Sequence, residues 1–186
     1  IQKVLISPAS NPYGGTVNAQ GIYVIDCSGG SLTIRNCRIV GTLIVLNCNT
    51  LTISNSVLWE PAVAGYPALV VNGQIKIDLS GLQLSEATLL TNFNPPGTPY
   101  NGSSNILTLD TYPSKIRGII YCDGDLSTPA SNVLTLQGTV LCGGKIDFDG
   151  TATITNDPNL TSFPPPGFRT GPTMVVQAGS WKQLVQ

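Results

Sequence analysis

The feature that most constrains the fold is a repeat of about 20 residues, built from short strands and polar corners. The triplet Leu-Thr-Ile begins at Leu32 and again at Leu51, 19 residues later. Cys27 and Cys48, each preceded by Asp or Asn, lie 21 residues apart. Looser copies bring the number of units to five. A unit of this length cannot bury its apolar side alone, so neighbouring units are expected to stack in register.

The strands of each unit carry apolar residues at every second position, and helical spacing is nearly absent. The corners are rich in Gly, Asn, Asp and Ser, which favour turns. Because parallel crossovers are strongly right-handed, the sequence predicts an all-β fold: a single-stranded right-handed parallel β-helix of about five rungs with a long loop insertion. The alternative is a β-sandwich, but likeness between positions about 20 residues apart favours the coil.

A single domain is expected from the length of 186 residues. The repeat breaks over residues 86–115, where Ser85 is expected to cap one helical turn and the Pro-rich stretch 94–102 to form a loop. Such an insertion is where binding is expected, the alternative being a solvated excursion. The domain is expected to consist of an N-terminal cap, rungs, the insertion, further rungs and a C-terminal cap, at residues 1–20, 21–85, 86–115, 116–156 and 157–186.

The composition excludes several classes of function. Charged residues make up 10% of the chain, against about 25% in an ordinary soluble domain, and the formal net charge is -1. Without a basic patch, no nucleic-acid partner is expected, and no apolar run approaches the roughly 18 residues of a membrane span. The chain has no histidine and no Cys-x-x-Cys pair, so no metal and no cofactor is expected.

Two pairs of aspartates are the weak candidates for a catalytic or calcium-binding site. Asp147 and Asp149 flank Phe148, so on a strand they share one face roughly 6.7 Å apart, a separation that suits an inverting glycosidase. Asp123 and Asp125 are similarly spaced at a corner. Neither pair sits in a complete calcium loop, and solvated turn aspartates are the favoured interpretation. With histidine absent, we expect no glycoside hydrolase or lyase activity, so the protein is not expected to be an enzyme.

The cysteines recur with the repeat. Cys27 and Cys48 are expected at equivalent corner positions of neighbouring rungs, as are Cys122 and Cys142. Neighbouring rungs bring Cα atoms within roughly 5 Å, inside the range for a disulfide, but stacked and buried free thiols explain the same pattern and are favoured. Cys37 has no evident partner.

Aromatic and amide side chains form two further groups. Four aromatic residues are candidates either to stack on sugar rings or to cover apolar edges of the coil: Trp59, Tyr66, Tyr100 and Tyr112. Four asparagines are expected at corners, where a hydrogen-bonded ladder of amides is favoured over a ligand-binding ridge: Asn36, Asn47, Asn55 and Asn72. In the C-terminal cap, residues 174–176 and Trp181 are expected to return as a last strand.

Several phrases resemble those of certain uncharacterised bacterial surface proteins. The stretch IRGIIYCDGDL at 116–126 resembles their phrase RGLVYVSGDL, and GTVLCGGKI at 138–146 is similar to GVVVVGGTL. NDP at 156–158 with PPPGF at 164–168 resembles their closing YDP…PPPGF, and EPAVA at 60–64 is similar to an earlier shared segment. These proteins are β-helical, pilin-like or secretion-associated, and common in planctomycete-type genomes.

The resemblance implies an extracytoplasmic protein, at the cell surface, in the periplasm or secreted, and transfers no catalytic residue. Because the chain begins at Ile1 rather than Met, a leader or anchor is expected to have been removed. We expect a non-catalytic structural or surface-displayed β-helical module whose partners are envelope or pilus-like assembly proteins. The alternatives are a carbohydrate-binding or polysaccharide-cleaving β-helix, with glycans as partners, and a self-assembling filament subunit.

Overall fold

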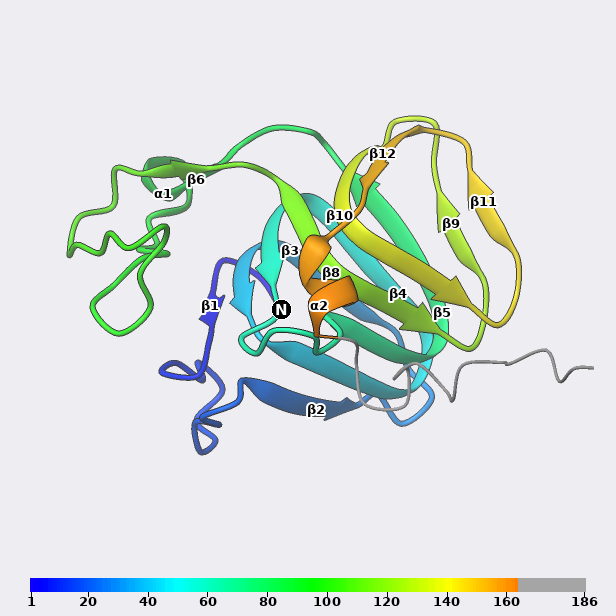
Figure 1. Cartoon of the computed structure of the whole chain (residues 1–186), viewed down its shortest axis with the longest axis horizontal. Coiled ribbons are helices and arrows are strands. Elements are labelled where there is room, and N and C mark those ends of the chain that lie inside the picture. The colour runs from blue at the N-terminus through cyan, green and yellow to red at the C-terminus, as the bar shows by residue number, and fades with distance from the viewer. Residues whose placement is uncertain (164–186) are drawn as a thin grey trace, which may run out of the picture.

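The chain winds through mainly parallel strands into a coil, as Figure 1 shows for residues 1–163, the part that this computed structural model describes. About half of the chain, 52%, lies in strands, and helix is almost absent. The predicted all-β parallel β-helix is thereby confirmed. In chain order the elements are β1 (Leu5–Ile6), β2 (Ile22–Asp26), β3 (Leu32–Val40), β4 (Thr42–Glu60), β5 (Leu69–Leu79), β6 (Leu84–Ser85), α1 (Glu86–Leu89), β7 (Thr111–Tyr112), β8 (Lys115–Cys122), β9 (Leu126–Thr128), β10 (Val133–Cys142), β11 (Ile146–Phe148), β12 (Thr151–Thr155) and α2 (Pro158–Ser162).

Strand pairing arranges the coil into three stacks, each with an inward column of apolar side chains. One column runs through β2, β4, β5, β8 and β10 as Ile25, Val45, Val71, Cys122 and Cys142. A second runs through β3, β4, β5, β9 and β11 as Leu32, Leu51, Ile75, Leu126 and Ile146. The third runs through β1, β3, β4, β8, β10 and β12 as Ile6, Ile39, Trp59, Ile116, Leu136 and Ile154.

The register confirms the repeat that the sequence indicates. Leu32 pairs with Leu51 across β3 and β4, and Cys122 pairs with Cys142 across β8 and β10. The coil has about seven turns rather than the expected five, because partial turns such as that of β1 carry no recognisable repeat. Residues 1–20 are accordingly more than a cap, since β1 pairs in parallel with β3.

Asparagines turn several of the corners. Asn36, Asn47 and Asn55 have φ angles of 53°, 50° and 62°, in the left-handed region that asparagine tolerates better than most residues. These angles turn the backbone within the long strands β3 and β4, so that one strand can pass from one stack to the next.

The insertion occupies one corner of the coil. The chain leaves the coil after β5 ends at Leu79 and returns at β8, where Lys115 and Ile116 pair directly with Leu58 and Trp59 of β4. The insertion (residues 80–114) therefore begins before the predicted residue 86, and it projects to the left in Figure 1. The predicted helical turn is confirmed: it is α1, and the Ser85 side chain accepts a hydrogen bond from the Thr88 amide at 3.3 Å.

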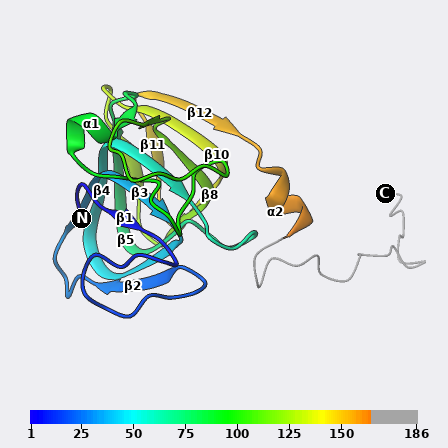
Figure 2. The same cartoon turned by 90° about the vertical axis from the view of Figure 1, so that its left-hand side faces the viewer.

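The far end of the described chain is α2, which stands beyond β12 in Figure 2. Its N-cap is Asp157, whose side chain accepts a hydrogen bond from the amide of Asn159 at 3.0 Å. The last strand expected at residues 174–176 and Trp181 lies outside the described residues.

Candidate functional site

The insertion is the best candidate for a functional site because two buried charges hold it in one shape. The first is Arg38 of β3, whose side chain is 1% exposed. Its guanidinium donates hydrogen bonds to the carbonyl oxygens of Phe93, Thr98 and Pro99 at 2.6, 2.9 and 2.8 Å. Burial lowers the pKa of Arg38, although its proximity to Glu60, 3.5 Å away, acts against this. Arg38 therefore ties three carbonyl groups of the insertion to the coil.

The second buried charge is Glu86, which is fully buried at the start of α1. One carboxylate oxygen accepts hydrogen bonds from the Phe93 amide at 2.6 Å and the Tyr112 hydroxyl at 2.8 Å, and the other accepts from the Asp110 amide at 3.1 Å. Burial, followed by the hydrogen bond to Glu86, raises the pKa of Tyr112 well above its usual range. Glu86 thus joins the beginning, middle and end of the insertion.

An apolar cluster supports these two charges beneath the insertion. Phe93 and Tyr112 are buried and meet edge to face, with ring centroids 6.2 Å apart. Tyr100 meets Tyr112 in the same way at 5.0 Å, and the guanidinium carbon of Arg38 lies 5.3 Å from the centre of the Tyr100 ring. Edge-to-face pairs and a cation over a ring are each favourable by roughly 0.5–1.5 kcal/mol. The insertion therefore has a small apolar cluster, which it shares with Leu5 of β1 and Leu58 of β4.

The outer loop of the insertion is closed by an amide–carboxylate clasp. One carboxylate oxygen of Asp110 accepts hydrogen bonds from the side-chain amides of Asn105 at 2.7 Å and Asn94 at 3.1 Å. Between the ends of the clasp, three aliphatic side chains face solvent, with exposures of 84%, 56% and 71%: Ile106, Leu107 and Leu109. Exposed apolar side chains that lie together on a surface mark an interaction site more often than isolated ones do.

Two of the candidate aspartates, Asp123 and Asp125, bind neighbouring turns of the coil. Asp123 accepts hydrogen bonds from the Asn72 side chain and the Gly73 amide, both at 2.5 Å, in the preceding turn. These bonds lower the pKa of Asp123, with the Gly73 amide contributing most. Asp125 accepts from the Lys145 amide at 2.7 Å, in the following turn. One carboxylate therefore binds the preceding turn and the other binds the following turn, so both link neighbouring turns of the coil.

The other pair, Asp147 and Asp149, lies at the less buried end of the coil. Asp147 forms an exposed ion pair with Lys145 at 2.6 Å, and this contact raises the pKa of the lysine. Asp149 is exposed, and its amide is bonded to the carbonyl of Thr128 at 3.3 Å. Among residues 1–163, no group of three or more acidic or cysteine side chains could hold a metal ion.

The candidate aromatic residues are placed in three different environments. Trp59 is fully buried in a column of the coil, and its indole donates to the Gly41 carbonyl at 3.0 Å. Tyr112 is buried and Tyr100 half-buried under the insertion, while Tyr66 is half-buried on the loop between β4 and β5. The rings of Trp59 and Tyr112 are therefore closed to a ligand, because neighbouring side chains cover them.

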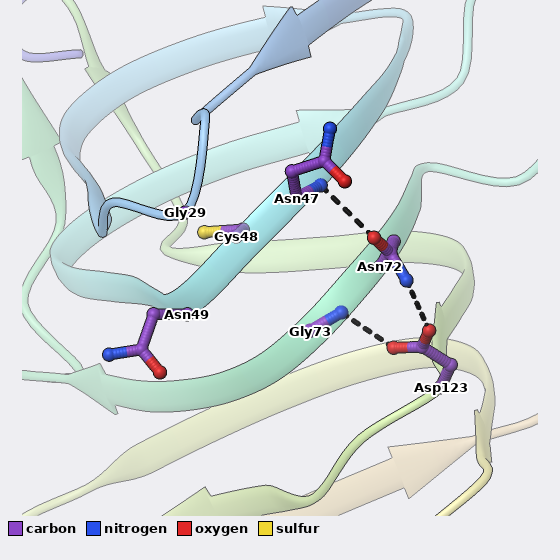
Figure 3. A pocket seen from close by; sticks show the side chains of 7 residues that line it. All are labelled: Gly29, Asn47, Cys48, Asn49, Asn72, Gly73 and Asp123. Carbon is purple, nitrogen blue, oxygen red and sulfur yellow. Dashed lines mark hydrogen bonds between the residues drawn. The ribbon is translucent and has the colours of Figure 1, made fainter.

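A shallow hollow of about 500 Å³ lies along one corner of the coil, and Figure 3 shows the polar side chains that line it. A chain of hydrogen bonds crosses the corner from Asp26 through Asn47 and Asn72 to Asp123. The amide of Asn47 donates to the Asn72 side chain at 3.1 Å, and the Asn47 side chain donates to Asp26 at 3.1 Å. These groups bond to one another along the coil, which is the behaviour expected of a structural ladder.

All five cysteines are free thiols. The sulfur atoms of Cys122 and Cys142 lie 3.4 Å apart in the inward column. Burial raises the pKa of Cys122 to about 12 and that of Cys27 to about 11, with hydrogen bonds to Cys142 and Cys48 as the next largest causes. Cys37 is fully buried, and its sulfur lies 3.0 Å from the carbonyl oxygen of Arg35, in its own strand.

Sequence reasoning missed Arg38 and Glu86. An arginine inside the apolar stretch Cys37 to Val40 is the one signal that pointed to a buried charge. Its partners are main-chain carbonyls, which leave no pattern of residue types. The same holds for two of the three donors that bind Glu86.

The fold and the candidate site together define the class of this protein: a parallel β-helix with an insertion that buried charged side chains hold at one corner. No family model, curated protein or solved structure gives a significant match to this chain. Within the described residues, no helix has both the length and the apolar character needed to cross a membrane.

Proposed function

We propose that this protein is a non-catalytic structural module in which the coil holds the insertion in a fixed shape for recognition by another macromolecule. The observation that carries the proposal is the burial of Arg38 and Glu86 in hydrogen bonds to the insertion's backbone. Burying an ionised group costs several kcal/mol unless good hydrogen bonds offset it. A merely solvated loop needs no such groups, because water satisfies its backbone.

The exposed side chains of Ile106, Leu107 and Leu109 are the surface that we assign to recognition. They lie within four residues of chain, on a loop whose ends the Asp110 clasp holds together. A preformed loop loses little conformational freedom on binding, so its apolar area contributes more fully to affinity. The partner that fits this surface is a protein, because the surface is aliphatic and carries neither the charge that nucleic acid requires nor an exposed aromatic platform for sugars.

The proposed setting is the outside of the cytoplasm, with an envelope or pilus-like assembly as the partner. Its support is the resemblance of residues 116–126 and 138–146 to bacterial surface proteins. Carbohydrate cleavage is disfavoured as a function because Asp123 and Asp125 are engaged with different turns of the coil.

Self-assembly is the second candidate function, and one observation favours it. Among residues 1–163, β2 pairs with β4 alone and β12 pairs with β10 alone, so each leaves one edge without a strand neighbour. Unpaired parallel edges at the two ends of a coil are templates for further strands. Sedimentation of the protein over a hundredfold range of concentration tests this: a mass that grows with concentration supports assembly, and a constant monomer mass excludes it.

The rigidity of the insertion is tested by amide hydrogen exchange on the intact protein. We expect the amides of Phe93, Asn105 and Asp110 to exchange slowly, and at rates similar to the coil amide of Ile75, because each of the four has an acceptor in the fold. If the three insertion amides exchange at the rate of an unstructured peptide, the proposal fails. It also fails if the protein releases reducing ends from a panel of neutral and acidic polysaccharides.

The assignment of the exposed side chains has its own test. A triple variant with serine at 106, 107 and 109 is expected to unfold within about 0.5 kcal/mol of the parent in urea, because these side chains are already in water. The matched control is Leu84→Ser, in the buried cluster of the insertion, which should cost roughly 2–4 kcal/mol. A similar loss in the triple variant would mean that the three side chains are structural, and would refute their role in recognition.

A further inference from the structure

The inward column of the coil that runs through β8 and β10 contains a pair of free thiols that the proposed function does not use. Cys122 and Cys142 are direct neighbours in the pairing of β8 and β10, where strand Cα atoms lie about 4.8 Å apart. Their sulfur atoms are 3.4 Å apart, and a disulfide needs Cα atoms between roughly 4.4 and 6.8 Å and a bond of about 2.05 Å. A small side-chain rotation would therefore bring the two sulfur atoms within bonding distance.

We propose that Cys122 and Cys142 are a modification site that takes up an oxidising disulfide of the glutathione class and forms a covalent staple between neighbouring turns. Cys142 is half-buried and Cys122 fully buried, so the reaction begins at Cys142. Its thiolate attacks one sulfur of glutathione disulfide, forming a mixed disulfide and releasing one glutathione thiolate. The thiolate of Cys122 then attacks the Cys142 sulfur and releases the second glutathione.

The exchange is balanced in atoms and electrons. The protein loses two electrons and two protons as its S–S bond forms, and the disulfide of glutathione is reduced to two thiols. The second step is slow near neutral pH, because burial raises the pKa of Cys122 to about 12 and little of it is thiolate. The same property makes Cys122 a poor leaving group, so the staple is reduced slowly once formed.

The position of the pair gives the staple a structural role. Through β5 and β8 the inward side chains are almost fully buried, whereas Ile146 of β11 and Ile154 of β12 are 43% and 45% exposed. Cys142 belongs to the turn that leads into these strands. A bond to Cys122 fixes that turn to the better packed part of the coil.

The test is mass spectrometry of the native full chain after incubation with glutathione disulfide at pH 8.5, with remaining thiols alkylated in denaturant. Cleavage before Asp123 and Asp125 separates the two cysteines, so a linkage is detected as joined peptides ending at Cys122 and containing Cys142. We expect this linkage, with Cys37 alkylated as the internal control. The stapled protein should melt roughly 6–12 °C higher.

Three further results would decide against the proposal. If Cys142 remains a glutathione adduct without joining Cys122 even after long incubation of the native protein at a higher pH, where more of Cys122 is thiolate, the geometry does not permit the second step. If the linkage forms only in denaturant, it is not a property of the fold. The variant Cys142→Ala should remove the rise in melting temperature, whereas Cys37→Ala, although destabilising, should leave the difference between oxidised and reduced protein unchanged. Loss of that difference in Cys37→Ala would also overturn the assignment.

Discussion

The sharpest test of how the insertion is held is the substitution Glu86→Gln. Glutamine has the same shape as glutamate but offers one acceptor oxygen and one NH₂ group. The three groups that face Glu86 are used as donors: the amides of Phe93 and Asp110 and the hydroxyl of Tyr112. Whichever way the new amide is turned, its NH₂ group faces at least one donor.

The expected loss is a difference between opposing effects. A buried donor left without an acceptor costs roughly 1–3 kcal/mol, and two hydrogen bonds to a charged group weaken by about 1 kcal/mol each when that group becomes neutral. Part of this loss of stability is offset, because the neutral glutamine side chain does not carry the desolvation cost of a buried charge. We expect a net loss of about 2 kcal/mol, located in the insertion.

Amide hydrogen exchange locates the loss as well as measuring it. Since 1.4 kcal/mol corresponds to a factor of ten, the amides of Phe93 and Asp110 should exchange about 30-fold faster in the variant, while the coil amide of Ile75 changes little. The control is Glu60→Gln, the other glutamate of the chain, whose side chain is 26% exposed and 3.5 Å from Arg38; its effect should stay below about 1 kcal/mol.

Equal effects of the two substitutions, or unchanged exchange of the insertion amides in Glu86→Gln, would refute the reasoning. Either result would mean that the carboxylate does not hold the insertion together. The basis of the proposed recognition role would then be lost, whatever the stability of the coil.

Two further predictions concern the coil. Gly73→Ala should lower the free energy of unfolding in urea by about 3 kcal/mol or more, because an added Cβ would overlap the carbonyl oxygen of Cys48. The control is Gly29→Ala, which should cost only about 1–2 kcal/mol, because φ is 83° there but the space around a Cβ is open. Similar losses in the two variants would contradict the steric argument. Burial alone would raise the pKa of Asp157, but hydrogen bonds from Arg117 and the start of α2 outweigh it and lower the pKa. Since the folded pKa lies below the unfolded value of about 3.9, this contribution is present above pH 4 and is lost as the pH falls through the folded pKa. Asp157→Asn should therefore reduce stability by about 1–2 kcal/mol at pH 6 and flatten its fall as the pH drops below 4; an unchanged dependence of stability on acid pH would contradict this.

The repeat was predictable because stacking makes the same demand on each turn. Leu32, Leu51 and Ile75 occupy one inward column, so they must be apolar and of similar size. That likeness is visible in the sequence without any knowledge of the fold. The third stack was harder to recognise: Trp59 and Ile116 are direct neighbours in space but are separated in the sequence by the whole insertion.

The candidate site was only partly predictable. The sequence indicated the insertion through its broken repeat and its prolines, and it gave the Ser85 cap correctly. It did not indicate what holds the insertion, because Arg38 and Glu86 bind mostly main-chain atoms that every residue possesses. Conversely, Asp123 and Asp125 have the residue types of a site but serve as ties between turns.

Some of the polar ties of the coil lie where its apolar packing is weakest. As far as residue 163, the inward side chains of the last turn are substantially exposed, so burial stabilises that turn less than those before it. There, the buried Asn132 binds both the Leu79 amide at 3.0 Å and the Thr151 carbonyl at 3.2 Å, and Asp157 pairs with Arg117 at 3.0 Å. In a coil whose turns contact only their neighbours, unfolding starts at the turn whose folding is favoured by the smallest free energy. We therefore expect the last turn to open first, with these few bonds setting the free energy at which it does so.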